Sequence, residues 1–183
     1  MSKPQPDALA IRDATIADLP AITAIYGHEV TNGSASFEID PPDLAEMTQR
    51  FETLHAGHFP YIVAEAGGRV LGYAYAGPYH RRAAYRFTLE DSVYVDSSAR
   101  GRGVGGRLLE ALVARCAQAG FRQMIAIISR SDTSPASIAL HSAAGFEHVG
   151  TLRDVGFKFG EWRNITIMQR ALGGGADHPP PQA

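Results

Sequence analysis

The sequence predicts an α/β protein whose mixed sheet is covered by helices on both faces, and three observations lead to this fold class. A chain of 183 residues with 45% hydrophobic residues is long enough to close one substantial core. Apolar residues recur at helical spacing in some segments and form β-favouring runs in others. These segments follow one another in the order β-α-α-β-β-β-α-β-α-β-β, which is typical of a mixed sheet with helices on both faces.

The first half of the chain contains a strand, two helices and a hairpin. Thr15 opens the first helix, because Asp18 follows at capping-box spacing before an apolar stripe. Asp-Pro-Pro-Asp at 40–43 starts the second helix. Gly67-Gly68 is a two-residue turn between β-leaning runs, which indicates a hairpin. The predicted strands are residues 8–12, or to 14 at most, 61–66 and 69–76.

The second half alternates strand and helix. Ser134 and Pro135 provide a cap and a first helical residue, and Gly145 ends the helix that they begin. The other helix carries Cys116 on its inward stripe. The predicted strands are residues 88–95, 122–128, 146–153 and 164–170, and the predicted helices are residues 105–119 and 134–145.

Composition limits the domain organisation and the partners. We expect one domain at residues 8–172 between flexible tails at 1–7 and 173–183, which are polar or rich in Gly and Pro. A net charge of −2 provides no overall basic field for nucleic acid or an anionic membrane. The chain has one cysteine, no apolar leader and no apolar run of the ~20 residues that span a bilayer. We therefore expect a cytoplasmic protein.

Arg100–Gly105, with the sequence Arg-Gly-Arg-Gly-Val-Gly, is the strongest motif of the chain. It lies between a predicted strand and a predicted helix, where backbone N–H groups and the helix dipole favour an anion such as diphosphate. Glycine lets the backbone approach the ligand, and the two arginines add charge-assisted hydrogen bonds. Gly-Lys-Ser or Gly-Lys-Thr of a nucleotide-cradling loop is absent from this turn. On its own the run predicts either an anion site or a tight connection with two solvated arginines.

The residues around this turn resemble a known family. Arg-x-x-Gly-x-Gly after Asp-Ser-Val-Tyr-Val at 91–95 is similar to the pyrophosphate motif of the GNAT superfamily of N-acetyltransferases. Further motifs bring the resemblance closest to phosphinothricin and methionine sulfoximine N-acetyltransferases, over roughly residues 11–172. These motifs are Tyr-Ala-Gly-Pro at 75–78, Tyr-x-x-Thr-x-Glu at 85–90, Ser-Ile-x-Leu-His at 137–141 and Gly-Phe-Lys-x-Gly-x-Trp at 156–162.

The resemblance implies the GNAT fold, with a mostly antiparallel sheet, and acetyl-CoA as co-substrate. It implies Glu90 as the general base that deprotonates the amine, with Asp91 as the rival carboxylate on the opposite face of the strand. It also implies that this strand parts from its neighbour near residues 93–95 and exposes N–H groups to the oxyanion. His141 stands where many members place a tyrosine that protonates the leaving thiolate, and it is either a proton donor or a substrate contact. The implied cofactor-binding residues are Val93, Tyr94, Val95, Arg100, Gly101, Arg102, Gly103, Val104, Gly105, Gly106, Ser134 and Ser137.

A basic cluster precedes Glu90 and suggests the acceptor. A guanidinium suits a carboxylate, which argues for an amino acid and against polyamines or aminoglycosides. The resemblance gives Arg82 this role, and it implies Phe37 and Tyr85 in the pocket with Glu90. Tyr73 and Tyr75 share one strand face and are equally compatible with core and pocket.

The favoured function is therefore transfer of acetyl to the α-amine of a small amino acid of the phosphinothricin, methionine sulfoximine or methionine sulfone type. The alternatives are acetylation of another amine, such as a protein N-terminus, and a non-catalytic CoA-binding domain. The resemblance also implies a homodimer with residues 158–162 near the active site. No metal is expected, because His55 and His58 lack further ligands nearby.

Overall fold

The computed structural model describes residues 8–129 and 135–180. Within these residues, seven strands form one sheet in the order β1-β2-β3-β4-β5-β7-β6. Neighbouring strands are antiparallel except for β4 and β5, which are parallel, so the sheet is mixed and mostly antiparallel as predicted. The strands are β1 (Ala10–Asp13), β2 (Tyr61–Ala66), β3 (Arg69–Pro78), β4 (Thr88–Val95), β5 (Gln123–Ser129), β6 (Glu147–Lys158) and β7 (Glu161–Ala171).

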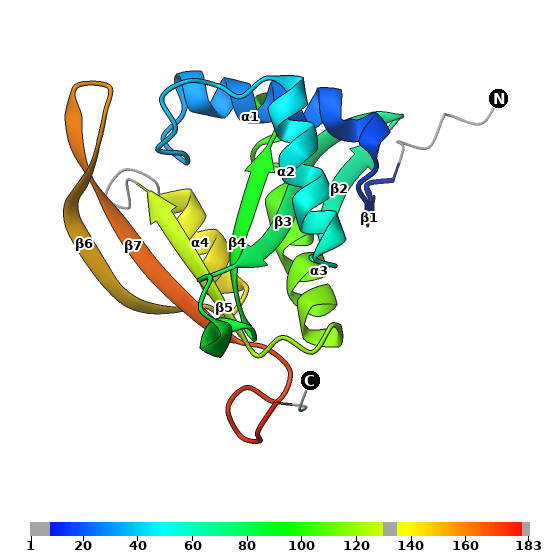
Figure 1. Ribbon diagram of the computed structural model, residues 1–183. Coiled ribbons are helices and arrows are strands. Elements are labelled where there is room, and N and C mark those ends of the chain that lie inside the picture. The colour runs from blue at the N-terminus through cyan, green and yellow to red at the C-terminus, as the bar shows by residue number, and fades with distance from the viewer. Residues whose placement is uncertain (1–7, 130–134, 181–183) are drawn as a thin grey trace.

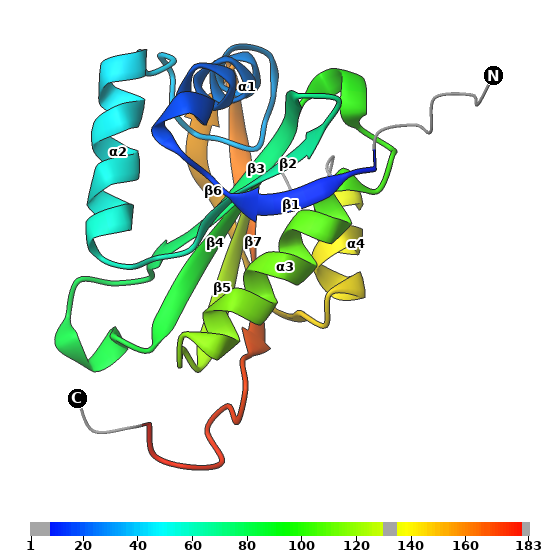
Figure 2. The same cartoon turned by 90° about the vertical axis from the view of Figure 1, so that its right-hand side faces the viewer.

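Helices cover both faces of this sheet, which confirms the predicted fold class. α1 and α2 pack on one face, and α3 and α4 on the other (Figures 1 and 2). No helix among the described residues is both long and apolar enough to cross a membrane. The helices are α1 (Leu19–Asn32), α2 (Leu44–Ala56), α3 (Val104–Gln118) and α4 (Pro135–Ala143).

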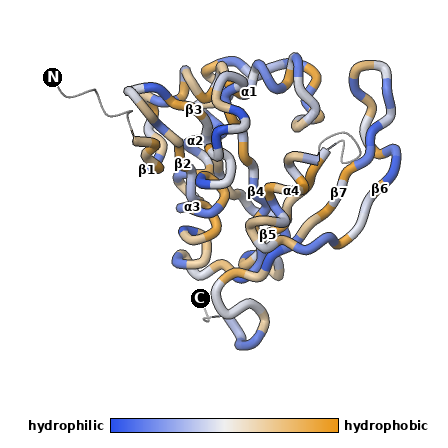
Figure 3. The backbone as a smooth tube through the Cα atoms, turned by 180° about the vertical axis from the view of Figure 1, so that it is seen from behind, coloured by the Kyte–Doolittle hydropathy of each residue, from blue (hydrophilic) through white to orange (hydrophobic). Residues whose placement is uncertain are grey.

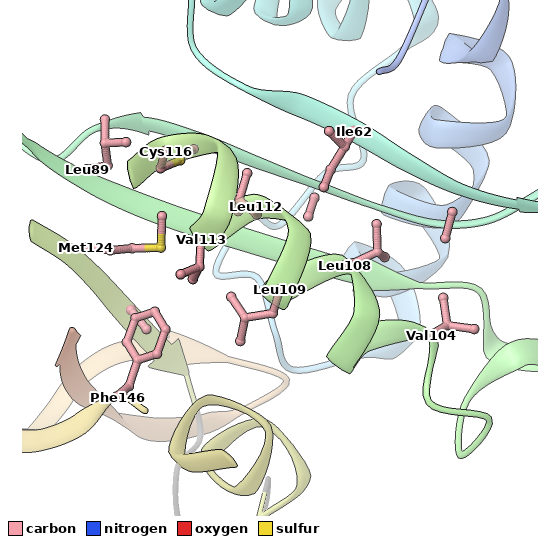
Figure 4. Packing of buried hydrophobic residues seen from close by; sticks show 14 of the residues in the cluster. Ile62, Leu89, Val104, Leu108, Leu109, Leu112, Val113, Cys116, Met124 and Phe146 are labelled. Atoms are coloured by element: carbon pink, nitrogen blue, oxygen red, sulfur yellow. The ribbon is translucent and has the colours of Figure 1, made fainter. Parts of the chain in front are cut away.

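Strand alternation divides the buried side chains between two cores. On β2, Ile62 and Ala64 face α3, whereas Tyr61 and Val63 face α1 and α2. The inner stripe of α3 packs against the sheet (Figure 4), and hydrophobic and hydrophilic residues alternate along this helix (Figure 3). Cys116 is fully buried on that stripe, as predicted.

Local signals in the sequence explain the ends of several elements. Thr15 and Asp18 form the predicted capping box, which here encloses a short 3-10 turn before α1. The Asp43 side chain accepts a hydrogen bond from the backbone N–H of Glu46 and caps α2. Gly67 and Gly68 both have positive φ, as the predicted two-residue hairpin turn requires.

The last hairpin is longer than the sequence predicted. β6 and β7 continue to a two-residue turn at Phe159 and Gly160, both with positive φ. A bulge between Leu152 and Gly156, where Asp154 also has positive φ, interrupts the ladder without ending it. The hairpin therefore extends from the body of the molecule as a two-stranded arm (Figure 1).

Both predicted tails fall partly outside the described residues. Residues 1–7 lie outside them, whereas residues 173–180 contain backbone hydrogen-bonded turns and neither helix nor strand. The predicted division into one domain and two flexible tails stays a prediction.

Candidate functional site

The two central strands part in the middle of the sheet. β4 pairs with β5 only from Thr88 to Glu90, whereas it stays paired with β3 as far as Val95. The backbone of residues 91–95 therefore has no ladder partner on the β5 side. The strands separate three residues after β4 begins, so the opening starts before the predicted residues 93–95.

Two cavities meet at this opening. The first, which we call the turn cavity, has a volume of about 600 Å³ and lies between residues 93–95, the glycine-rich turn and the start of α4. The second, the strand cavity, has a volume of about 430 Å³ and lies between β4, β5, α4 and residues 35–38. They share four lining residues, Ala35, Val93, Tyr94 and Ser137, so they adjoin each other at the opening.

The turn cavity has the features of an anion site. The first turn of α3 begins in it, with Gly103 as N-cap at φ 78°. A Cβ at Gly101 or Gly103 would meet no atom within 4 Å, so their conformation and not crowding within the chain favours glycine. The predicted cofactor-binding residues that line the cavity are Val93, Tyr94, Val95, Arg100, Gly101, Gly103, Val104, Gly105, Gly106 and Ser137.

Other predicted binding residues lie elsewhere. Arg102 is exposed and lies outside the lining of the turn cavity, and Ser134 is outside the described residues. Arg82 and Tyr85 are in the exposed β3–β4 connection and do not line the strand cavity. Tyr85 packs there against His80, with 5.0 Å between ring centroids.

Arg100 has a partner that the sequence did not suggest. Its guanidinium donates to Oε2 of Glu29 at 2.7 Å, while Oε1 of Glu29 accepts from the backbone N–H of Ala35 at 2.8 Å. A Cβ at Gly33 would lie 1.8 Å from Oε1, so glycine there leaves room for the carboxylate. Glu29 thus joins the end of α1, the segment after it and the glycine-rich turn. The available signal was a charged residue within the buried stripe of Ile22, Ile25 and Tyr26.

Glu90 lies on the face of the sheet that α1 and α2 cover. It pairs in register with Gly77 and lines the strand cavity together with Tyr75 and Ser92. Burial raises the pKa of Glu90, and the negative charge of Asp91 raises it further. The carboxylate is therefore a stronger base than an ordinary glutamate.

Asp91 points to the opposite face and pairs with His141 of α4. Nε2 of His141 lies 3.0 Å from Oδ2 of Asp91, and Nδ1 lies 2.7 Å from the carbonyl oxygen of Ser137. Both partners are acceptors, so the geometry favours an imidazole with a proton on each nitrogen. Burial alone lowers the pKa of His141, but the hydrogen bond and charge of Asp91, with the Ser137 carbonyl, outweigh it and raise the pKa.

Phe37 lines the strand cavity, where the hairpin arm holds its segment. A Cβ at Gly156 would lie 2.4 Å from the Phe37 ring, so glycine permits this contact. Lys158 is 3% exposed, and its Nζ donates to the carbonyl oxygen of Ser36 at 2.8 Å. Ser129 at the end of β5 donates to the carbonyl oxygen of Ser34. The wall of the cavity therefore depends on β5, β6 and the segment after α1.

The described residues contain no group of three or more His, Cys, Asp or Glu side chains arranged to hold a metal ion.

The profile of the acetyltransferase (GNAT) family matches residues 22–146, which include β4, the glycine-rich turn and α4. The chain belongs to the GNAT acetyltransferase family. The fold and the family therefore confirm the resemblance found in the sequence.

Similar GNAT proteins are named phosphinothricin or methionine sulfoximine acetyltransferases. A phosphinothricin N-acetyltransferase of Alcaligenes faecalis is 51% identical over 168 residues, 92% of this chain and 85% of that protein. An L-methionine sulfoximine/L-methionine sulfone acetyltransferase of Pseudomonas aeruginosa is 44% identical and covers 89% of this chain and 94% of its own. The crystal structure of a phosphinothricin acetyltransferase from Sinorhizobium meliloti with acetyl-CoA has a TM-score of 0.92 at 48% identity, covering 96% of this chain and 94% of that one.

Proposed function

We propose that this GNAT protein transfers the acetyl group of acetyl-CoA to the α-amine of a small amino acid of the phosphinothricin, methionine sulfoximine or methionine sulfone type. The observation that carries the proposal is the opening between β4 and β5, where the two cavities meet beside Glu90. The turn cavity has the anion-binding features that a CoA pyrophosphate needs, and the strand cavity contains the carboxylate of Glu90 as a base. The names of the similar proteins support the class of acceptor.

The turn cavity fits acetyl-CoA on two features of this chain. The N-terminus of α3 and the glycine-rich backbone favour the negatively charged pyrophosphate. The unpaired edge of residues 91–95 offers backbone N–H groups to carbonyl oxygens of an extended chain. In the strand cavity, Oδ1 of Asp91 is buried without a hydrogen-bond partner among the described residues. Acetyl-CoA supplies the activated acetyl group.

Glu90 acts as general base in this proposal. The α-ammonium of the amino acid gives one proton to the Glu90 carboxylate, and its nitrogen then bonds to the thioester carbon. The carbon–sulfur bond breaks, the nitrogen loses its second proton, and the thiolate gains one. The products are an N-acetylamino acid, free CoA and one proton released to solvent.

Backbone N–H groups and His141 complete the proposed chemistry. N–H groups on the open edge of residues 91–95 are available to the oxyanion that forms when nitrogen attacks. His141 lines the strand cavity, and a doubly protonated imidazole is an acid near neutral pH. We propose that it donates the proton to the thiolate. Both of its N–H groups bond to acceptors in the structure, so this step requires one of them to leave Asp91 or the Ser137 carbonyl.

Arg82, Phe37 and Tyr85 are the proposed acceptor contacts. Phe37 is already a wall of the strand cavity. Arg82 and Tyr85 are exposed in the connection that leads directly into β4, six and three residues before the strand begins at Thr88. A bound carboxylate would draw them toward the cavity mouth.

We further propose a homodimer formed through the hairpin arm. β6 is the edge strand of the sheet, and an edge strand with exposed apolar side chains favours association. The exposed apolar residues of the arm are Val149, Leu152, Val155, Phe157, Phe159 and Trp162.

Thiol release by the purified protein tests the function. We expect acetyl-CoA-dependent release with methionine sulfone, methionine sulfoximine and phosphinothricin. Strong turnover of a peptide N-terminus with none of the free amino acids would contradict the acceptor class. Binding of acetyl-CoA without turnover of any amine would contradict the enzymatic function.

A further inference from the structure

A third cavity lies on the same sheet face as Glu90. It has a volume of about 410 Å³ and lies between α2 and strands β2 and β3. We call it the tyrosine cavity, because four tyrosines, Tyr26, Tyr61, Tyr73 and Tyr75, line it. Its volume is within the range of about 300–1,000 Å³ that small-molecule pockets have. The α2 residues that line it are Glu46, Met47, Gln49, Arg50, Thr53 and Leu54.

The tyrosine cavity adjoins the strand cavity. Tyr75 lines both of them. Leu54 of the tyrosine cavity lies 3.3 Å from the position of a Cβ at Gly77, which is the register partner of Glu90. A ligand held at Glu90 would therefore lie beside the residues that line the tyrosine cavity.

The order of residues along β3 and β4 matches the shape of an amino acid. The loop with Arg82 joins β3 to β4. With increasing distance from this loop, the paired residues on one face are Gly77 with Glu90, then Tyr75 with Ser92, and then Tyr73 with Tyr94. Same-face residues are about 7 Å apart along a strand, since each residue advances about 3.4 Å. A carboxylate at the loop and an amine at Glu90 thus direct the side chain toward Tyr75 and Tyr73.

The walls of the tyrosine cavity favour a neutral aromatic or long apolar group. Tyr61 and Tyr75 are stacked, with centroids 5.1 Å apart, and Tyr61 is likewise stacked on Tyr73. Arg50, at the rim, is held by two hydrogen bonds to Glu38 and by Glu46, so its charge is already compensated. A negatively charged side chain gains no free cation there.

The hydroxyl group of Tyr73 is unpaired within the part of the chain that the structure describes. Its side chain is fully buried, and its hydroxyl has no hydrogen-bond partner among the described residues. A buried hydroxyl without a partner is costly, so a bound group or water that reached it would relieve that cost.

From this geometry we infer that the tyrosine cavity is a side-chain subsite, which extends the acceptors of the proposed transferase to amino acids with aromatic or long apolar side chains. The inference rests on the proposed function, because the same Glu90 would deprotonate the amine. It adds acceptors whose side chains lack the sulfone, sulfoximine or phosphinate oxygens of the acceptors proposed above.

The ratio of kcat/KM for L-phenylalanine to kcat/KM for L-methionine sulfone tests the subsite. Thr53→Trp is the filling variant, because Thr53 is exposed on α2 and lines the cavity. Glu52→Trp is the matched control, because Glu52 is next to Thr53 on α2 and is also exposed, but does not line the cavity. We expect wild type to acetylate phenylalanine, and Thr53→Trp to lower the ratio by about tenfold or more, within the range for lost apolar pocket contacts. Glu52→Trp should leave it unchanged.

Two outcomes would overturn the subsite and leave the proposed function standing. One is turnover of methionine sulfone with neither turnover of phenylalanine nor competition by it. The other is phenylalanine turnover that Thr53→Trp and Glu52→Trp affect equally. Failure of every amino acid would instead overturn the proposed function, and the subsite with it.

Discussion

At the scale of single residues, Asp91 and His141 form a buried ion pair beside the opening of the sheet. Their side chains are 2% and 6% exposed, and the imidazole donates at both ends to acceptors. The fold therefore favours the protonated ring. Because the folded pKa of His141 is raised above 6.5, this stabilisation is fully present below that pH and is lost as pH rises through the folded value.

We predict that Asp91→Asn lowers the pKa of His141. The variant removes the charge and the ionic hydrogen bond that raise the pKa, and leaves the burial that lowers it. Titration of the His141 ring protons by NMR should give a midpoint above 6.5 in wild type and a lower one in Asp91→Asn. Equal midpoints in the two proteins would show that Asp91 does not hold the imidazolium.

Sequence reasoning predicted the residue types of this site better than their pairing. Alternation along β4 correctly placed Glu90 and Asp91 on opposite faces. Nothing in the linear sequence indicated that α4 would bring His141 to Asp91, because that contact joins residues far apart in the chain. The Arg100–Glu29 pair was missed for the same reason.

At the scale of elements, Glu29 connects three segments that build the two cavities. Its carboxylate is 10% exposed and holds both Arg100 and the backbone of Ala35, which lines both cavities. Loss of this carboxylate leaves the backbone N–H of Ala35 and the guanidinium of Arg100 without their acceptor.

We predict that Glu29→Ala lowers the free energy of unfolding by about 1.5–3 kcal/mol, the range for hydrogen bonds to a charged group. Glu29→Gln should retain more of the stability, since its amide oxygen still accepts from Ala35. Urea denaturation measures both, with the exposed Glu52→Ala as control. If Glu29→Ala unfolds at the same urea concentration as the control, then Glu29 does not hold the segment.

The elements with strong local signals were predicted closely. β4 occupies the predicted residues 88–95, and α3 differs from its prediction by one residue at each end. The two strands of the hairpin arm were predicted too short, because Asp154, Gly156 and Gly160 are residue types that are typical of loops. In the structure the first two belong to a bulge and the third to a two-residue turn.

At the scale of the whole molecule, the hairpin arm determines the proposed assembly. Trp162 is 63% exposed on the arm, and its ring packs against Phe157. The same arm carries Lys158 and Gly156, which support the wall of the strand cavity. Association through the arm would therefore act on the active site.

We predict that Trp162→Glu shifts a dimer toward monomer and lowers activity, because it places a charge in an apolar contact. Sedimentation velocity measures the change. Ile16→Glu is the matched control, since Ile16 is also 63% exposed but lies at the other end of the sheet, after β1. A wild-type protein that sediments as a monomer at all concentrations would contradict the proposed dimer.

The fold class followed from the sequence because alternation and helical periodicity are local properties. The order of strands in the sheet did not, since β7 lies between β5 and β6 through contacts that span the last third of the chain. The opening between β4 and β5 was implied by the resemblance and not by the residues. The two cavities at this opening depend on the order of the strands, which the local sequence does not determine.

The central claim is that Glu90 deprotonates the acceptor amine, and the pH dependence of kcat/KM for methionine sulfone tests it most directly. A base works only when ionised, so activity should fall as pH drops through a pKa that burial and Asp91 raise above 4.5. Glu90→Gln should lose this acid limb and about 10²- to 10⁴-fold in rate. The exposed Glu52→Gln should keep the wild-type profile. If Glu90→Gln retained the wild-type rate and acid limb, Glu90 would not be the base.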